Sequence, residues 1–358
     1  MGSSLFLQKL YLRNFRKYEE ALFEFIPTIN TIIGPNAHGK TTILEAIQFL
    51  MSGRSFRTQQ IADLIQHGQS SFYIEASFIK QGIEQTLRIS YDGNERKIVH
   101  NSTICRSSTN LLGLLQGVIV TPDNASLIKG SPLLRRHFLD LQIAQIDPLY
   151  VHHLTRYAGA MRQRNVLLKR KELNTIEGWE QEMATAGAYL TLQRKQAVAD
   201  LQKLGQPLHK MLTDEQQSFG LEYKSSCSQI EDLELLRKHY LQQWNKIRHR
   251  EKELGMSLYG PHRDDLLIKI GDREARLFAS EGQQRSCVMA LRLAEWQRLH
   301  ALSQEAPLML IDDVGISLDG SRRQKLLTHL RNLSQVFLTS TEPFLESGDL
   351  SPHSKFSW

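Results

Sequence analysis

The sequence predicts an α/β fold, in which both ends of the chain build one sheet-containing head and the middle adds a helical lobe. Three observations support this prediction. Short apolar segments that are typical of buried strands lie near both ends, at residues 29–33 and 308–311. The first of them leads through a glycine-rich turn into an amphipathic helix at residues 40–51. Between residues 149 and 255 the apolar side chains recur every three or four positions, which is typical of helices.

The elements of the expected head come from distant parts of the chain. Strands are expected at residues 5–12, 29–33, 308–311 and 336–338. The segment 308–311 is wholly apolar, as expected of a central strand that is covered on both faces. The helix at residues 40–51 keeps its apolar side chains on one side. We expect the polar stretch from Glu346 to the C-terminus to form no clear element.

The middle of the chain carries three helical stripes of apolar side chains. They run from Leu154 to Leu168, from Ile176 to Ala197 and from Ile230 to Leu254. Each stripe spans a few turns with heptad-like spacing, so we favour helices that pack on a domain over a free-standing coiled coil. Turns are expected at Gly205-Gln206-Pro207 and at residues 225–228. The expected domains are residues 1–148 and 256–358, which form the head, and residues 149–255, which form the helical lobe.

Composition excludes several classes of protein. Among 358 residues there are 44 Lys and Arg against 38 Asp and Glu, a basic excess that favours polyanionic partners without deciding the point. No apolar run is long enough to span a bilayer, and charged residues interrupt the first segment, so we expect no signal peptide. Cys105, Cys227 and Cys287 lie far apart and fit neither a disulfide framework nor a zinc site, which favours a reducing cytoplasm.

The glycine-rich turn after residues 29–33 matches a phosphate-binding motif. The pattern G-x-x-x-x-G-K-[ST] is satisfied by Gly34, Pro35, Asn36, Ala37, His38, Gly39, Lys40 and Thr41, and Thr42 follows directly. Backbone N–H groups of such a loop and the positive N-terminus of its helix face phosphate groups. Lys40 would place its charge between the β- and γ-phosphates of ATP, and the Thr41 hydroxyl would ligate Mg²⁺. An ordinary glycine turn before a helix would leave the lysine unexplained.

Two acidic residues follow the apolar segment 308–311. Asp312 would hold Mg²⁺ through its water shell, and Asp313 lies where a general base or a water-orienting residue is needed. Paired acids after a strand also occur in plain turns. Together with the phosphate-binding motif, they predict an ATP-hydrolysing site whose catalytic residues are Lys40, Asp312 and Asp313.

A second helix start has the composition of a phosphate contact. Ser280 is a good N-cap residue, and Gln283 three residues later would complete a capping box at the start of an ordinary helix. The segment Ser280-Glu281-Gly282-Gln283-Gln284 also resembles the signature motif of ABC-type ATPases. That resemblance implies that the Ser280 hydroxyl and the Gly282 N–H contact the γ-phosphate held by another subunit, with Gln283 beside them, in a dimer that sandwiches two ATP molecules. It also places Asp319, in Ser317-Leu318-Asp319, in the D-loop that crosses the dimer interface.

Further segments resemble the RecF family of SMC-like ATPases, and together they cover nearly the whole chain. Residues 10–18 are similar to the opening strand of these heads, whose basic residues often approach the nucleotide. The other RecF-like segments are residues 53–58, 129–132, 135–140, 163–169 and 259–266. The last of them is the most specific. Whether its His262 and Arg263 form a loop near the nucleotide or a purely structural turn is left open by the sequence.

The resemblance implies a function in DNA repair. It implies ATP-dependent dimerisation on DNA, a preference for duplex next to a single-stranded gap, and cooperation with RecR and RecO in loading RecA. The residues themselves indicate only candidate phosphate-binding faces, which would give affinity without sequence readout. The candidates are Arg54, Arg57, Arg135, Arg136, Lys169, Arg170, Lys171, Arg248 and Arg250. For each one alone a solvated surface charge is the simpler role, and the absence of an aromatic-rich basic stripe favours duplex over single-stranded DNA.

Four features depart from the ABC pattern. Asp313 stands where ABC ATPases usually carry glutamate, and a shorter acid should orient the attacking water less well, so we expect slow hydrolysis that suits a switch. Ala37 stands where these loops commonly carry glycine, so we expect a backbone conformation there that accommodates a Cβ. Residues 339–341 replace the switch histidine, and residues 120–123 lack the Q-loop glutamine. RecF-like proteins share the last two features.

Three other functions fit parts of the sequence. A true SMC protein would insert hundreds of heptad residues, far more than residues 149–255 supply. The nucleotide-binding subunit of a transporter would need a membrane partner and would leave the segment 259–266 to coincidence. A binding module that uses ATP only to hold a dimer together stays open because of Asp313, and a single-turnover hydrolysis assay separates it from a slow ATPase.

Overall fold

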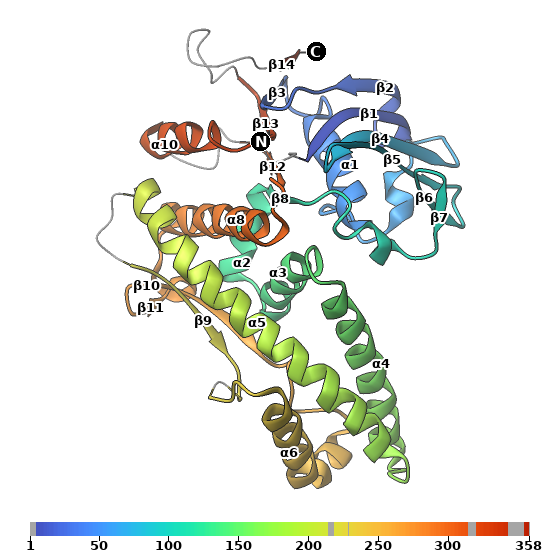
Figure 1. Cartoon of the computed structure of the whole chain (residues 1–358), viewed down its shortest axis with the longest axis vertical. Helices are drawn as coiled ribbons and strands as arrows, with labels where there is room; N and C mark the ends of the chain where they lie inside the picture. Colours follow the sequence, from blue (N-terminus) through green and yellow to red (C-terminus); the bar gives the residue numbers. More distant parts are fainter. Residues whose placement is uncertain (1–4, 214–217, 228, 314–319, 343–353, 358) are drawn as a thin grey trace. The chain divides into compact units, whose positions relative to one another are not determined.

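The computed structural model describes residues 5–213, 218–227, 229–313, 320–342 and 354–357, the last of these by the backbone alone (Figure 1). The chain divides into two compact units. Unit 1 comprises Met1–Ala125, Pro207–Glu215 and Glu281–Trp358, and unit 2 comprises Ser126–Gln206 and Gln216–Ser280. The domain boundaries expected after residues 148 and 255 remain a prediction, because a division by packing does not decide where a lobe is inserted.

Unit 1 contains two sheets. One is antiparallel with the strand order β2-β1-β4-β5-β6-β7, and the other has the order β14-β3-β13-β12-β8 with parallel pairs throughout. The strands of the first sheet are β1 (Phe6–Phe15), β2 (Tyr18–Glu24), β4 (Phe72–Lys80), β5 (Ile83–Tyr91), β6 (Arg96–His100) and β7 (Thr103–Cys105). The strands of the second are β3 (Ile29–Ile33), β8 (Gly117–Val120), β12 (Leu308–Ile311), β13 (Val336–Ser340) and β14 (Ser354–Ser357). Short 3-10 turns lie at Ile61–Leu64, Ser108–Leu111 and Pro122–Ala125.

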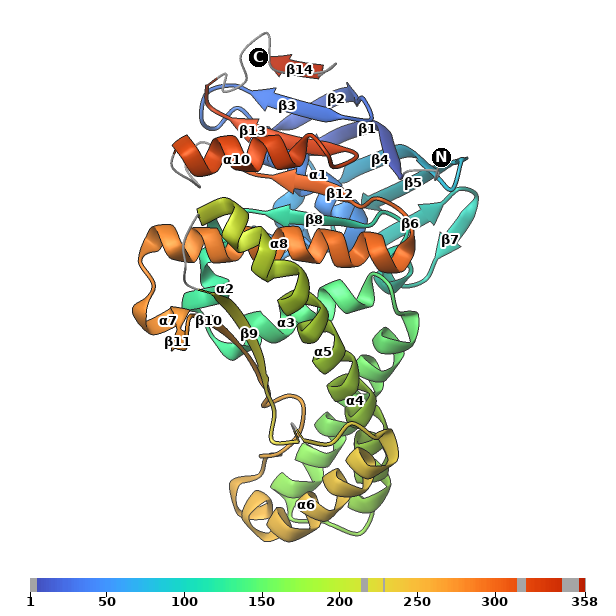
Figure 2. The ribbon, with the colours of Figure 1, turned by 60° about the vertical axis from the view of Figure 1, so that its left-hand side comes forward.

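Helices cover both faces of the parallel sheet. Helix α1 (Lys40–Ser52) lies between the two sheets, while α8 (Glu281–Ser303) and α10 (Gly320–Leu330) lie on the opposite face of the parallel one (Figures 1 and 2). The apolar side of α1 is buried in one core with both sheets. All four residues of β12 are buried, as its apolar composition predicts. Because the strands are parallel, the carboxyl ends of β3, β13 and β12 meet at one edge, with β13 in the middle.

The strands and the helix expected in the head are confirmed, but one strand was not expected. Residues 354–357 form β14, which pairs in parallel with β3, although we expected no element after Glu346. This expectation was wrong because the open edge of β3 offers backbone donors and acceptors, which pair with any extended segment whatever its side chains.

Unit 2 combines helices with a three-stranded antiparallel sheet of order β11-β10-β9. Its helices are α2 (Ser126–Lys129), α3 (Pro132–Ala144), α4 (Pro148–Arg170), α5 (Ile176–Thr213, whose last turns belong to unit 1), α6 (Leu233–Leu254) and α7 (Ala275–Phe278). Its strands are β9 (Phe219–Lys224), β10 (Asp265–Ile270) and β11 (Arg273–Glu274). The apolar stripes of α4, α5 and α6 share one buried cluster that includes Tyr157, Met183 and Trp244. The prediction of helices that pack on a domain is therefore confirmed.

The turn expected at Gly205-Gln206-Pro207 is wrong, because all three residues lie inside α5. Gly205 has a packing role: a Cβ there would lie 2.7 Å from Cε1 of Phe219. Pro207 removes one backbone donor from the helix, a cost that tertiary packing has to offset. The other expected turn is confirmed at residues 226 and 227, and Ser228 lies outside the described residues. Within the described parts of the chain, no helix is both long and apolar enough to cross a membrane.

Candidate nucleotide-binding site

The phosphate-binding motif forms the turn between β3 and α1. Gly39, directly before α1, has a φ of 95°, and Ala37 has a φ of 65°. Both values lie in the left-handed region, so the backbone at Ala37 does not suit a Cβ, contrary to expectation, and costs about 1 kcal/mol relative to glycine. Residues 35–38 are exposed at the tip of the turn, whereas Thr42 is buried and donates its N–H to the Gly39 carbonyl at 2.9 Å. The first turn of α1 therefore starts directly beneath an open loop.

Lys40 is a buried cation that the described residues provide with no carboxylate partner. Its ammonium donates to the carbonyl oxygens of Gly34 at 2.5 Å and Pro35 at 2.8 Å, and the residue is only 8% exposed. Both acceptors belong to the loop itself. Because a buried charge is costly unless it is neutralised, this arrangement fits a loop that receives an anion. The loop N–H groups and the N-terminus of α1 favour the same kind of ligand.

Asp312 and Thr41 meet at the edge of the parallel sheet. The Thr41 hydroxyl donates to Oδ1 of Asp312 at 3.0 Å, and the hydroxyl of Thr339 donates to the same oxygen at 2.7 Å. Burial raises the pKa of the Asp312 carboxyl, against the hydrogen bonds from these two hydroxyls. A hydroxyl beside a carboxylate supplies the hard oxygen ligands that Mg²⁺ prefers, so Thr41 and Asp312 fit the predicted metal site.

Thr339 is a site residue that no sequence motif predicted. Because β13 lies between β3 and β12, its last residues reach both the phosphate-binding turn and the paired acids. The Thr339 hydroxyl accepts the Asp313 N–H at 2.8 Å, and the Ser340 carbonyl accepts the Gly34 N–H at 3.2 Å. The one sequence signal for Thr339 was that residues 339–341 stand where ABC ATPases carry the switch histidine, which marked the end of this strand as unusual. Asp313 itself has a φ of 54°, a left-handed conformation that aspartate adopts more readily than most residues.

One basic residue at the turn between β1 and β2, Lys17, approaches the loop. The approach of such residues to the nucleotide, which the RecF-like opening segment implied, remains a prediction. Lys17 donates to the Ala37 carbonyl at 3.3 Å, and the Tyr18 hydroxyl donates to the Gly39 carbonyl at 3.3 Å. Burial and then the charge of Lys40 lower the pKa of Lys17. Gly39 is needed chiefly for its φ of 95°, and a Cβ there would also lie 2.6 Å from Cε of Lys17 and displace that side chain. Two cations on one loop strengthen the case for a polyanionic ligand.

Glu45 connects the loop after α1 to the same region. It is fully buried on α1 and accepts two hydrogen bonds from Arg16, at 3.0 and 2.6 Å, and one from Ser55 at 2.5 Å. Arg57 lies 3.4 Å from the same carboxylate. The segment 53–58 is therefore fixed onto the helix that carries the phosphate-binding motif, a role that its composition alone does not reveal.

The signature-like segment stands at the start of α8. This helix begins at Glu281, so Ser280 occupies the position of an N-cap. Ser280 and Gly282 are exposed, and Gln283 is half-buried. The capping box and the contact of these residues with another subunit remain predictions. Asp319, together with Ser317 and Leu318, lies outside the described residues.

His262 and Arg263 belong to a hydrogen-bonded turn in unit 2. The Tyr157 hydroxyl lies 2.7 Å from Nδ1 of His262, and the Ser257 carbonyl lies 3.2 Å from its Nε2. Arg263 donates to the same carbonyl at 3.3 Å. Burial lowers the pKa of His262 to about 4, so the ring is neutral at pH 7. Of the two roles that the sequence left open, these contacts favour the structural turn.

Some of the basic residues expected to meet DNA are used inside unit 2. Arg135 is 4% exposed and donates to both carboxylate oxygens of Asp265, at 2.7 and 2.8 Å. Arg136 donates to the Asp264 carbonyl at 2.7 Å, and Arg248 donates to Glu180 at 2.6 Å. Arg135 is therefore not a phosphate contact, which corrects the expectation.

Four of the expected basic residues in unit 2 do face solvent. Lys169, Arg170, Lys171 and Arg250 are exposed, and they make no ion pair with the described residues. They come from the ends of α4 and α6, which lie side by side, since a Cβ at Gly255 would be 2.9 Å from Cγ of Lys169. This group, the basic cluster of unit 2, keeps its full charge for a partner.

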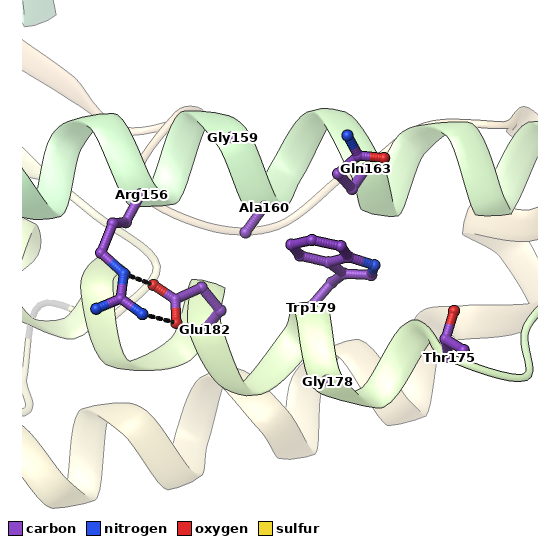
Figure 3. A pocket seen from close by; sticks show the side chains of 8 residues that line it. All are labelled: Arg156, Gly159, Ala160, Gln163, Thr175, Gly178, Trp179 and Glu182. Atoms are coloured by element: carbon purple, nitrogen blue, oxygen red, sulfur yellow. Dashed lines mark hydrogen bonds and ion pairs between the residues drawn. The ribbon is translucent and has the colours of Figure 1, made fainter.

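A groove of about 670 Å³ lies between α4 and the first turns of α5 (Figure 3). Gly159 and Gly178 face this space, because apart from their own helix backbone and chain neighbours no atom lies within 4 Å of the position that a Cβ would take at either residue. The ring of Trp179, 37% exposed, lies between the two helices, and Arg156 pairs with Glu182 at one end (Figure 3). The groove shares no residue with the phosphate-binding motif.

Known proteins match this chain over nearly its full length. A family model described as the RecF/RecN/SMC N terminal domain matches residues 6–349. The DNA replication and repair protein RecF of Protochlamydia amoebophila is 53% identical over 345 residues, which cover 96% of this chain and 96% of the relative. The chain belongs to the RecF family. The RecF protein of Symbiobacterium thermophilum is 37% identical, over 94% of this chain and 92% of the relative.

Solved structures agree with membership of the RecF family. The recombination mediator protein RecF-ATPrS of the RecFOR pathway superposes with a TM-score of 0.90 at 27% identity, covering 100% of this chain and 97% of the other. The Smc head domain of Pyrococcus furiosus, bound to the C-terminal domain of ScpA, superposes with a TM-score of 0.56 at 18% identity, covering 94% and 90%. The second likeness concerns the fold alone. The predicted fold class, an ABC/SMC-type ATPase head with a helical lobe, is confirmed.

Proposed function

We propose that this RecF-family protein is a weak DNA-dependent ATPase that serves as a switch in recombinational gap repair and in the maintenance of replication forks. It binds ATP and Mg²⁺, dimerises with ATP, and binds duplex DNA near single-stranded gaps in the cytoplasm. There it helps RecO and RecR to load RecA. The observation that carries ATP binding is Lys40, a buried cation whose described contacts are loop carbonyls. The repair role rests on the names of the relatives.

The roles of the residues follow from their chemistry. The N–H groups of Gly34 to Thr42 and the Lys40 ammonium bind the phosphates. Thr41 and Asp312 hold Mg²⁺, which supplies positive charge at the phosphates when bound. Asp313 orients the attacking water and accepts its proton. Ser280, Gly282, Gln283 and Asp319 complete the site across the dimer. In this assignment Asp313 is the base and Asp312 serves Mg²⁺.

Hydrolysis is the step that separates a switch from a module held together by ATP. Asp313 is one methylene shorter than the glutamate of ABC ATPases, so the water is held less well. In Asp313→Asn the base is lost while the backbone N–H that bonds Thr339 is kept. We expect single-turnover hydrolysis to fall by about a hundredfold, as for the loss of other general bases, with unchanged ATP affinity. An unchanged rate in this variant would contradict the role of Asp313 as the base, whereas a wild-type chain that hydrolyses no ATP would support the non-hydrolysing module.

The DNA surface proposed is the basic cluster of unit 2. Its four cations are exposed and make no ion pair with the described residues, so they are able to neutralise phosphates without reading the sequence of bases. Binding of this kind weakens steeply as the salt concentration rises, because the counterions that the protein displaces from DNA then gain less free energy on release.

The test of the whole proposal is sedimentation of the pure protein with gapped duplex DNA, with and without Mg-ATP. We expect monomers without nucleotide and dimers on the DNA with it. Fully paired duplex of the same length is the matched control for the preference for gaps. A monomer that binds ATP but neither DNA would still be consistent with an ATPase that uses the phosphate-binding motif, and it would contradict the repair function.

A further inference from the structure

Two large apolar side chains stand exposed directly before the signature-like segment. Leu277 is 67% exposed and Phe278 is 63% exposed, both on the short helix α7 of unit 2. One face of the Phe278 ring carries the guanidinium of Arg273, 5.4 Å from the ring centroid. Single exposed hydrophobic residues are common on protein surfaces and need no explanation. This pair differs because only Ala279 separates it from Ser280.

The short distance along the chain limits how far Phe278 can lie from a phosphate that Ser280 contacts. Two residues span at most about 7 Å of chain, and a hydroxyl contacts a phosphate oxygen at roughly 3 Å. A γ-phosphate of another subunit that meets Ser280 therefore comes within roughly 12 Å of the Phe278 backbone. The loop that holds this phosphate has its residues 35–38 exposed, and they include the ring of Pro35 and the ring of His38. An exposed Phe278 would thus face an exposed, partly apolar loop tip.

We propose that Leu277 and Phe278 form the apolar anchor of the ATP-closed dimer, against residues 35–38 of a second copy of this chain. The inference rests on the proposed function, because it takes the Ser280 contact as given and adds the apolar contact beside it. A buried aromatic side chain at the centre of an interface commonly carries much of its affinity. Arg273 and Arg276, both exposed, flank the pair with positive charge, which complements the phosphates of the second copy.

The contact explains how a nucleotide controls dimerisation. Without ATP the loop tip offers a small apolar surface beside the cations Lys17 and Lys40, so two copies of this face have little to hold them together. With ATP the phosphates neutralise the loop and attract Ser280 and the two arginines. The apolar pair then becomes buried, and its burial adds affinity that the polar contacts alone would lack.

The experiment compares Phe278→Ser and Leu277→Ser with Leu235→Ser, a leucine that is 57% exposed on α6 of the same unit. Sedimentation with Mg²⁺ and ATPγS measures the dimer dissociation constant, fluorescence titration with a labelled ATP analogue measures monomer affinity, and thermal unfolding measures the fold. We expect the dimer dissociation constant to rise about tenfold or more in Phe278→Ser, as for an interface anchor, and to stay unchanged in Leu235→Ser. Monomer affinity for the nucleotide should stay within twofold, and Phe278→Leu should restore most of the dimer.

The outcomes separate the two levels of the argument. If Phe278→Ser and Leu277→Ser both form dimers with the dissociation constant of the wild type, the inference is overturned and the proposed function stays intact. A wild-type chain that stays monomeric with ATPγS overturns ATP-dependent dimerisation and the inference with it. If Phe278→Ser lowers the unfolding temperature, dimerisation is judged from Phe278→Leu instead. A Phe278→Leu variant that unfolds at the wild-type temperature but does not dimerise also counts against the anchor.

Discussion

Arg164 in unit 2 and Lys40 in unit 1 both carry a positive charge that the fold buries. Arg164 is fully buried and donates to Glu180 at 2.8 Å, to Glu251 at 2.6 Å and to Ser257 at 2.9 Å. Lys40, which is 8% exposed, donates to two loop carbonyls, and no described carboxylate pairs with it. The first cation is neutralised within its unit and can hold helices together. The second keeps its charge for a ligand.

A half-buried carboxylate of unit 2 and a buried one of unit 1 show the same difference. In unit 2, Asp140 accepts from Arg194 at 2.8 Å, so its charge is neutralised by a cation. In unit 1, Asp312 accepts from the hydroxyls of Thr41 and Thr339, and no described cation pairs with it. Burying a charge without a counter-charge costs stability. Lys40 and Asp312 thus leave one positive and one negative charge without a described counter-charge at the same sheet edge. The phosphates of Mg-ATP would compensate the first charge and its Mg²⁺ the second.

The largest expected effect is the loss of Arg164. In Arg164→Met, Glu180 and Glu251 stay buried with less compensation, so we expect the free energy of unfolding to fall by about 3–5 kcal/mol. Urea unfolding of the purified variants measures it. Arg156→Met is the control, because the Arg156 side chain is 52% exposed in its pair with Glu182 and should contribute less than about 1 kcal/mol. Equal losses in the two variants would mean that the buried cluster does not hold unit 2 together.

The comparison predicts the opposite pattern for Lys40→Met. The lysine makes no described ion pair, so removing its charge should change the free energy of unfolding by less than about 1 kcal/mol. ATP affinity should fall by roughly a hundredfold, because the variant loses a charge-assisted contact to phosphate in a buried site. Isothermal titration with Mg-ATP and urea unfolding of the same samples test both halves. A variant that unfolds easily and still binds ATP would reverse the roles assigned to Lys40 and Arg164.

The sequence predicted the site in unit 1 better than the charges in unit 2, for a physical reason. Gly34 to Thr41 and Asp312 act through backbone geometry and through contacts next to one strand end, so their spacing along the chain is diagnostic. Thr339 escaped prediction because its role depends on β13 lying between β3 and β12, a matter of sheet order. Ala37 was misjudged because a residue type does not determine φ.

Single basic residues could not be assigned from sequence at all. Arg135 and Lys169 are the same kind of residue in a sequence, yet Arg135 meets Asp265, which lies 130 positions away, while Lys169 faces solvent. Only the packing of α3 against β10 decides which carboxylate is near. The turn expected at Gly205 failed for a similar reason, since Phe219 makes the glycine necessary within a helix.

A smaller effect is expected at the basic cluster of unit 2. Replacing Lys169, Arg170 and Lys171 by alanine removes three cations without breaking a described ion pair. Duplex affinity should fall by about tenfold or more near physiological salt, and the slope of log affinity against log salt should lose about 2–3 units. Fluorescence anisotropy over a salt series measures both. Lys9→Ala is the control, because Lys9 is already paired with Glu24. A reduced affinity with an unchanged salt slope would show that these side chains do not contact phosphate.

The smallest effect concerns the pH dependence of unit 2. Burial holds the pKa of His262 at about 4, below its ordinary value of 6.5, so between these values the unfolded chain binds more protons than the folded chain. The stabilisation is complete above pH 6.5 and is lost as the pH falls toward 4. The charges of Arg263, Arg136 and Arg164 oppose protonation in the same direction. Between pH 7 and pH 5 this half-buried ring should account for about 1–2 kcal/mol of the loss in unfolding free energy, after allowance for solvent screening.

Urea unfolding of His262→Gln at these two pH values tests the assignment of the turn. We expect the variant to lose less stability than the wild type between pH 7 and pH 5, while His249→Gln, whose ring is 87% exposed, behaves as the wild type. ATP affinity should be the same in all three proteins, because the described contacts of His262 lie within unit 2. If His262→Gln instead weakens ATP binding and keeps the wild-type pH profile, then the ring serves the nucleotide. In that case unit 2 would contribute a side chain to nucleotide binding, in addition to the buried ion pairs that hold its helices together.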